Sequence, residues 1–287
     1  MADVIEQRPS RRRRWIGVAV LLLAVAVPVG SMLFSESPAP PPPAPSPTFE
    51  PAPALSTFLP KPNVVHPAET GGKTRTIHVT FPDGSRARVS YPQELDLAGL
   101  GLRPYASVVL GTAFRELVAP YQGAAEVAAG GPMIRELAEG VTLWPRQVGS
   151  GGQVMLYAFG DWQITLRDQP DPLSYEDRRT LAHGLHGTVT KDGFLTYTAD
   201  EPVRLMAAGQ VLAGQPVGPQ LWFGGGTGPL LVLAPSPSCD SVGQAVPLIL
   251  LRTGAFGTRC RDGFMIAASG RQSFVDRAVE GIRIRPE

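Results

Sequence analysis

His183 and His186 lie three residues apart in the segment AHGLH, near the end of an expected helix. Histidines at this spacing lie on one face of a helix and are frequent metal ligands. A zinc site requires further ligands, and the sequence has neither an HExxH motif nor a cluster of Cys or Asp close to these residues. We therefore predict no metal or cofactor site here. We expect the imidazoles to interact with the last carbonyl groups of the helix.

Two acidic pairs could supply acid–base chemistry. Asp168 with Asp171, and Asp200 with Glu201, lie beside prolines in expected turns. Paired carboxylates hydrolyse glycosides only when a cleft holds them at a fixed separation. Closeness in the sequence does not establish that separation, so the pattern predicts no catalytic residue.

Two glycine-rich segments resemble reactive motifs only in part. VGSGG around Ser150 is not the GxSxG motif of a serine hydrolase, because its first residue is valine. FGGGTG, residues 223–228, is not followed by Lys-Ser or Lys-Thr and contains no GxGxxG. It is therefore no phosphate-binding loop, and we expect a connection between strands.

Trp144, Trp162 and Trp222 each lie in a strand-like segment. Packing in the core is the expected role of these large side chains. The alternative is an exposed aromatic platform that binds a sugar or glycan.

Cys239 and Cys260 are the two cysteines of the chain. An even count in an exported domain predicts one disulfide bond. Metal ligation and a free thiol pair are the alternatives, but no CxxC spacing favours either of them.

The N-terminal region has the features of a membrane anchor. Trp15–Phe34 contains 20 residues without a charge, and a helix of that length spans ~30 Å, about one hydrocarbon core. Ala24-Val25-Ala26 has the form of a signal-peptidase site, but apolar residues continue to Phe34, which favours an uncleaved anchor. Arg8 and Arg11–Arg14 precede the run, so residues 1–14 are expected in the cytoplasm and 15–34 in the bilayer.

A proline-rich spacer follows, over residues 35–69. Ser35 to Pro62 contains 11 prolines in 28 residues, and such a chain is expected to be disordered, solvated and extended, reaching on the order of 80 Å. The segment PPPPAP could also be a ligand of a proline-binding domain. Its lack of flanking basic residues favours the spacer.

The remaining residues, 70–287, are predicted to form an extracytoplasmic α+β domain, mainly of antiparallel strands and hairpins with a few short helices. Alternating apolar residues with Asp-Gly turns predict hairpins around Asp83-Gly84 and Asp192-Gly193. Further strands are expected over 141–145, 153–160, 161–168, 220–226, 230–235, 246–254 and 282–286. Helices are expected over 106–119, 132–139, 174–185 and 273–280, the last two beginning at the caps Ser174 and Ser273. Gly111 disfavours the first of these helices, and its segment ASVVL is a strand in the alternative reading.

Charge excludes one class of partner. The chain has 26 basic and 25 acidic residues, and removing the five arginines and two acids before Ser35 leaves 21 and 23. A nearly neutral domain lacks the basic surface that binds nucleic acid. Arginine outnumbers lysine 23 to 3, which is typical of a GC-rich bacterial genome.

No motif in the chain resembles a known family. The expected protein is a single-pass cell-membrane protein, held in the lipid bilayer by residues 15–34. Its extracytoplasmic domain is expected to bind an envelope protein or glycan and to act as an envelope-associated regulator rather than as an enzyme. The alternative is an anchored hydrolase that acts on a cell-envelope substrate.

Overall fold

The computed structural model describes residues 69–120, 123–145, 152–168, 171–225, 228–237, 247, 250 and 254–287. All of these residues belong to one compact unit of the chain. The predicted tail, membrane segment 15–34 and most of the spacer lie outside the described residues and stay predictions. Within the described part of the chain, no helix combines the length and the apolar character needed to cross a bilayer.

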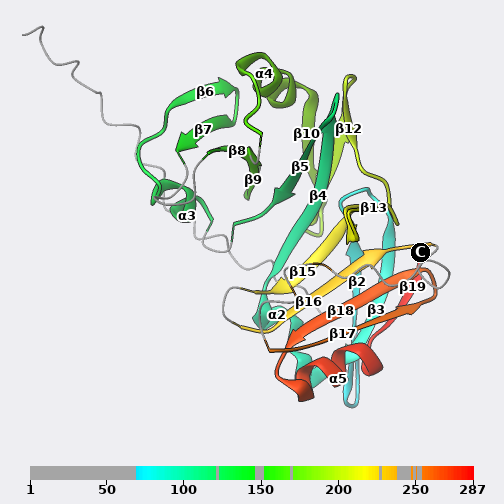
Figure 1. Ribbon diagram of the computed structural model, residues 1–287. Helices are drawn as coiled ribbons and strands as arrows, with labels where there is room; N and C mark the ends of the chain where they lie inside the picture. Colours follow the sequence, from blue (N-terminus) through cyan, green and yellow to red (C-terminus); the bar gives the residue numbers. More distant parts are fainter. Residues whose placement is uncertain are drawn as a thin grey trace, which may run out of the picture. The chain divides into compact units, whose positions relative to one another are not determined.

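Most of the described elements are antiparallel strands, which confirms the coarse prediction of a mainly antiparallel fold with few short helices (Figure 1). The largest sheet of the described residues has eleven strands. Ten of them form a continuous path: β17 (Ala255–Arg261), β18 (Phe264–Gly270), β16 (Leu230–Pro235), β15 (Gln220–Gly224), β4 (Leu102–Leu110), β5 (Ala113–Val118), β9 (Trp162–Asp168), β8 (Gln153–Phe159), β7 (Val141–Pro145) and β6 (Arg135–Ala138). The eleventh, β12 (Val203–Leu205), pairs with β4.

The long strand β4 carries two partners on one side. β15 pairs with its first residues, where Gln220 lies opposite Tyr105, and β12 pairs with its last residues, where Val203 lies opposite Leu110. β5 pairs along the other side. Two later segments of the chain, β12 and β15, therefore pair with β4 on the side opposite its neighbour in sequence, β5.

A second sheet has the order β1 (Glu69–Gly71), β2 (Thr74–Thr80), β3 (Arg86–Pro92) and β19 (Arg283–Pro286). The predicted hairpin at Asp83-Gly84 is confirmed between β2 and β3. The Asp83 side chain accepts a hydrogen bond from the Ser85 backbone N–H at 3.0 Å, and Gly84 has a φ of 84°, which suits glycine. The predicted final strand is confirmed as β19, which adds the C-terminus to this sheet.

Two small hairpins complete the strands. β10 (Leu185–Val189) pairs with β11 (Leu195–Ala199), as predicted from Asp192-Gly193, and β13 (Val211–Leu212) pairs with β14 (Gln215–Pro216). The strands predicted over 141–145, 153–160 and 161–168 are confirmed as β7, β8 and β9, with the chain reversing at Gly160. The segment predicted as a strand over 246–254 lies mostly outside the described residues, as does Cys239.

The helices are short: η1 (Gln93–Leu95), α2 (Leu97–Leu100), α3 (Ala124–Ala128), α4 (Tyr175–Gly184) and α5 (Gln272–Gly281). The predicted cap of α4 is confirmed, because Ser174 Oγ accepts the Asp177 backbone N–H at 3.0 Å. The predicted cap at Ser273 is wrong. α5 begins at Gln272, so Ser273 lies inside its first turn, and the N-cap residue Arg271 supplies no side-chain cap.

Two predicted helices are strands. The helix predicted over 106–119 is the hairpin β4–β5, which turns at Gly111 with a φ of 58°. In β5 the side chains of Arg115 and Leu117 are buried and that of Glu116 between them is exposed, as expected where successive side chains point to opposite faces of a sheet. Residues 132–139 were also predicted to form a helix, but they contain the strand β6. This strand pairs with β7 and has a register shift between Glu136 and Ala138. Sheet pairing outweighs the weak helical propensity of these segments.

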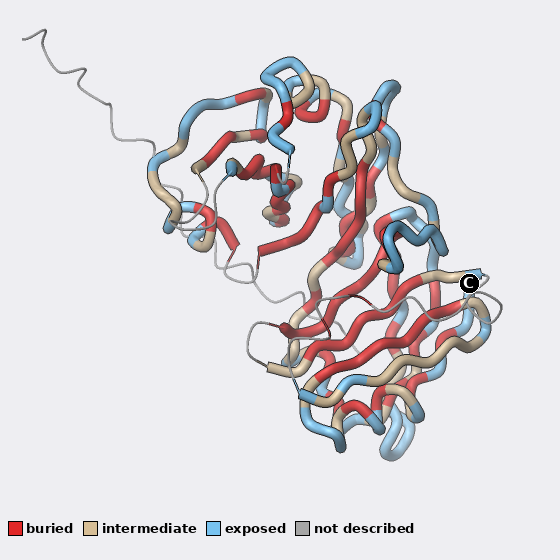
Figure 2. The backbone as a smooth tube through the Cα atoms, in the orientation of Figure 1, coloured by how far each residue is buried: buried red, intermediate tan, exposed pale blue. Residues whose placement is uncertain are grey.

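The main core lies where the two sheets meet. Phe81, at the end of β2, stacks on Phe264 of β18 with ring centroids 5.8 Å apart, and both belong to one cluster of buried residues. β16 is buried on both faces, since Leu231 and Leu233 belong to the main core while Leu230 and Val232 belong to a second cluster (Figure 2). Each fully buried Leu or Val stabilises the fold by about 1.5–3 kcal/mol. Continuous burial explains the unbroken apolar run LLVLA.

Candidate functional site

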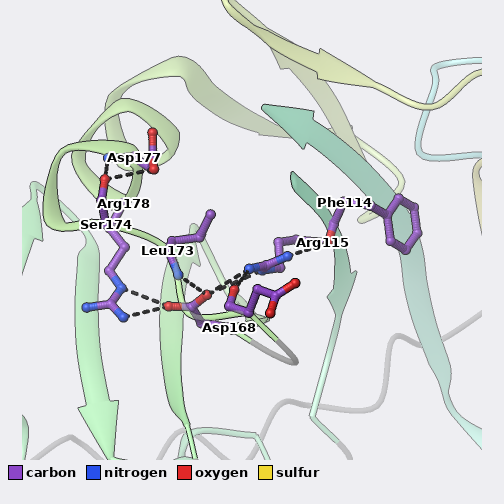
Figure 3. Close-up of polar contacts among 8 residues, drawn as sticks. Phe114, Arg115, Asp168, Leu173, Ser174, Asp177 and Arg178 are labelled. Carbon is purple, nitrogen blue, oxygen red and sulfur yellow. Dashed lines mark hydrogen bonds and ion pairs between the residues drawn. The ribbon is translucent and has the colours of Figure 1, made fainter. Parts of the chain in front are cut away.

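Asp168 is the centre of a buried polar cluster rather than half of an acidic pair (Figure 3). Arg178 donates from Nε and Nη2 to Asp168 Oδ2 at 2.8 and 2.7 Å. Arg115 donates from Nε and Nη2 to Asp168 Oδ1 at 3.3 and 3.1 Å, and the Leu173 backbone N–H adds a third donor group at 2.7 Å. Asp171 contributes only its backbone carbonyl, which accepts a hydrogen bond from Arg115.

This arrangement makes Asp168 a structural residue. Both carboxylate oxygens are occupied by donors, and the side chain is 0% exposed, so it has no access to a substrate proton. The two guanidiniums come from β5 and α4, while Asp168 ends β9. The cluster therefore links α4 to the large sheet through hydrogen bonds and ion pairs. Sequence reasoning missed it because Arg115 lies 53 residues from Asp168, and no local signal links the two.

The structure separates the two histidines predicted to share a helix end. His183 lies in the last turn of α4, whereas His186 lies in β10. His186 Nε2 is 2.9 Å from Asp200 Oδ2, so its partner is a carboxylate and not a helix carbonyl. His183 lines a pocket of about 420 Å³ with charged neighbours on α4 and the β11–β12 turn: Glu176, Arg179, Asp200 and Glu201. Within the described residues, no group of three His, Cys, Asp or Glu side chains is placed to hold a metal ion.

The tryptophans are core residues, as predicted. Trp144, Trp162 and Trp222 are 5%, 7% and 6% exposed. Their indole N–H groups donate to Thr142 Oγ1, to the Gly193 carbonyl and to Gln220 Oε1, respectively. None of the three rings forms an exposed platform for a glycan.

The described part of the glycine-rich segment accommodates an arginine. Arg103 donates from Nη2 to the Gly224 carbonyl at 2.7 Å. A Cβ on Gly225 would lie 2.3 Å from that nitrogen and would displace the guanidinium, and the φ of 115° at this position also favours glycine. The expected loop thus has a packing role at Gly224 and Gly225. Ser150 lies outside the described residues.

A larger pocket, of about 740 Å³, lies at the start of α5. Its wall includes two guanidiniums, one carboxylate and several apolar groups, among them Glu94, Leu95, Pro229, Arg271, Phe274 and Arg277. We call this the α5 pocket. Its residues come from η1, from the chain beside β16 and β18, and from α5, segments that are distant in sequence. Sequence reasoning did not identify it, because no motif marks residues that meet only in the folded chain.

Two buried tyrosines are electrostatically unusual but are not placed for catalysis. Tyr157 of β8 and Tyr197 of β11 are 0% and 4% exposed, and burial raises the pKa of both hydroxyls above the ordinary value of 10.0. Within the described residues, neither hydroxyl has a hydrogen-bond partner. A neutral phenol buried in this way neither accepts nor releases a proton near pH 7.

Comparison with protein-family models, with curated proteins and with solved structures finds no match to this chain. The pockets, the charges and the order of segments along the chain are therefore the features that bear on function.

Proposed function

We propose that the protein is a single-pass membrane protein that presents an extracytoplasmic binding domain to a partner in the cell envelope. The observation that carries this proposal is the order of three segments: Arg11–Arg14, the uncharged run Trp15–Phe34 and the proline-rich spacer. Basic residues at one end of an apolar run keep that end in the cytoplasm. The spacer then holds the domain away from the bilayer, within reach of envelope proteins or glycans.

A binding role is favoured over catalysis by the chemistry of the described residues. Asp168, the most enclosed carboxylate of the candidate pairs, is saturated by donors from Arg115 and Arg178. The α5 pocket has the size of a ligand site, since such sites measure about 300–1,000 Å³. The near balance of basic and acidic residues argues against nucleic acid as the partner.

Reporter fusions test the orientation. A reporter that is active only in the cytoplasm, fused after Glu287, should be silent, while an export-dependent phosphatase at the same position should be active. The matched variant replaces Arg11–Arg14 with glutamate, which removes the basic flank and should reduce phosphatase activity. An active cytoplasmic reporter with a silent phosphatase in the unaltered chain would contradict the proposal. A full-length band on a gel distinguishes an uncleaved anchor from a cleaved signal peptide.

The second candidate is an anchored hydrolase that acts on a cell-envelope substrate. The His186–Asp200 pair favours it, because a carboxylate 2.9 Å from an imidazole can orient that ring as a general base, and Asp200 lines the pocket of about 420 Å³ that also contains His183. The test compares product release from isolated envelope by the full chain and by His186→Ala. A loss of at least tenfold would support the hydrolase, and equal rates would exclude this pair as its catalytic centre.

A further inference from the structure

We infer that the α5 pocket binds a small anionic ligand with an apolar body. The inference rests on the proposed binding function and deepens it by naming a site and a ligand class. Three properties of the pocket lead to it: its size, its excess of positive charge and its apolar wall.

The size fits a small molecule or a short end of a larger one. The pocket measures about 740 Å³, which lies within the range of ligand sites, about 300–1,000 Å³. Glycines form part of its wall. Gly254 and Gly270 approach each other so closely that a Cβ on Gly254 would lie 2.9 Å from the Gly270 carbonyl oxygen. This close approach of two backbone segments requires glycine in this part of the wall.

The charges favour an anion. Arg271 and Arg277 line the pocket together with one carboxylate, that of Glu94. Among the described residues, neither guanidinium takes part in an ion pair. Arg277 donates from Nε to the Ser273 carbonyl at 2.9 Å, and its two terminal nitrogens have no hydrogen-bond partner among the described residues, so they are available to a ligand. Guanidiniums bind carboxylate and phosphate groups through paired hydrogen bonds, so an acidic group is the ligand chemistry that fits.

The rest of the wall favours an apolar body attached to that acidic group. Leu95 is 3% exposed and belongs to the main core, and Phe274 packs against the same core while lining the pocket. Pro229 adds a third apolar surface. A ligand that carries only charge would leave these surfaces in contact with water. A ligand with an aromatic or aliphatic part would cover them.

An acidic group on an apolar body occurs both in anionic lipids and in soluble organic acids. The test uses the full chain in phosphatidylcholine nanodiscs, titrated by calorimetry with phenyl phosphate. Inorganic phosphate and benzyl alcohol, the charged and the apolar halves of the probe, are titrated separately. A parallel titration in nanodiscs that contain phosphatidylglycerol distinguishes the sources, because a lipid ligand would compete with phenyl phosphate whereas a soluble one would not.

The decisive comparison is between two double variants with equal charge change. We expect phenyl phosphate to bind more tightly than inorganic phosphate or benzyl alcohol. The variant Arg271→Gln/Arg277→Gln should lower the affinity for phenyl phosphate about tenfold or more, since hydrogen bonds to charged groups contribute at this scale. Arg86→Gln/Arg285→Gln, which removes two exposed arginines outside the pocket, should leave binding unchanged.

A third variant tests the site sterically. Gly228 lines the pocket, and among the described residues its Cβ would approach only the Gly225 carbonyl oxygen, at 3.6 Å, so Gly228→Leu adds bulk without a clash against the described backbone. This variant should also lower the affinity for phenyl phosphate. No binding by the unaltered chain, or equal losses in both double variants, would overturn the inference. The topology reporters are unaffected by these variants, so failure of the pocket and failure of the membrane proposal are separable.

Discussion

Arg178 donates two hydrogen bonds to one oxygen of Asp168, at 2.8 and 2.7 Å, while Arg115 occupies the other oxygen. Two positive charges thus surround one negative charge in a nearly water-free site. Burying such charges is costly, but removing the carboxylate alone would leave both guanidiniums buried without a counter-charge.

Asp168→Ala should therefore lower the free energy of unfolding by about 3–5 kcal/mol. Urea denaturation of a chain that begins at Pro67 would measure the loss. Asp171→Ala is the matched control, because Asp171 is exposed and contributes its backbone carbonyl to the cluster. Equal stabilities of the two variants would show that the cluster does not hold α4 to the sheet.

Gly187→Ala should destabilise the contact between β8 and β10. A Cβ on Gly187 would lie 2.4 Å from a ring atom of Phe159, so the ring would have to move. We expect the free energy of unfolding to fall by about 1–3 kcal/mol, a decrease typical of overpacking. The double variant Gly187→Ala/Phe159→Leu should lose less than the sum of the single changes, and additive losses would contradict the contact.

Tyr157→Phe should leave stability unchanged or raise it slightly at pH 7, because it removes a buried hydroxyl that has no partner among the described residues. Thermal melts of the two chains would show the difference. A loss of more than about 1 kcal/mol would indicate a hydrogen bond to that hydroxyl.

The same substitution should change the response to alkaline pH. Burial raises the pKa of Tyr157 in the folded chain, whereas the unfolded tyrosine ionises near 10.0. The folded chain therefore holds more protons above that pH, and its stability should fall as the pH rises past 10. Tyr157→Phe should reduce this fall, and the exposed Tyr175→Phe serves as the control. Identical pH profiles of all three chains would contradict the prediction.

The disulfide between Cys239 and Cys260 remains a prediction, since Cys239 lies outside the described residues. Thiol titration of denatured, unreduced protein should find no free thiol. Reduction should then lower the free energy of unfolding by about 3 kcal/mol, the entropic effect of opening a loop of this length. Two free thiols per chain would remove part of the argument for export.

The described domain should fold without the anchor and the spacer. A chain that begins at Pro67 retains β1, which starts at Glu69, and should melt cooperatively. Its melting temperature should equal that of a chain that begins at Ser35. A decrease of several degrees in the shorter chain would mean that the spacer packs on the domain rather than being a solvated tether.

Local patterns predicted much of the secondary structure. Alternation with Asp83-Gly84 and Asp192-Gly193 located two hairpins, and Ser174 located the start of α4. The helix predicted over 106–119 was wrong because the apolar residues there fit the spacing of a helix as well as that of a strand. Periodicity over so short a segment does not distinguish the two. The pairing of β4 with β5, β12 and β15 decided in favour of strands.

The chain's local chemistry was therefore sufficient for turns, caps and most strands, because these depend on residues within a few positions of one another. It was also sufficient to propose the anchor and its orientation, which depend on the composition of one continuous segment. The tertiary structure alone decided that Asp168 is enclosed by Arg115 and Arg178 and that Arg271 and Arg277 share a pocket with Leu95. Burial and the partner of a charge depend on which distant segments pack together, and that packing is a property of the whole fold.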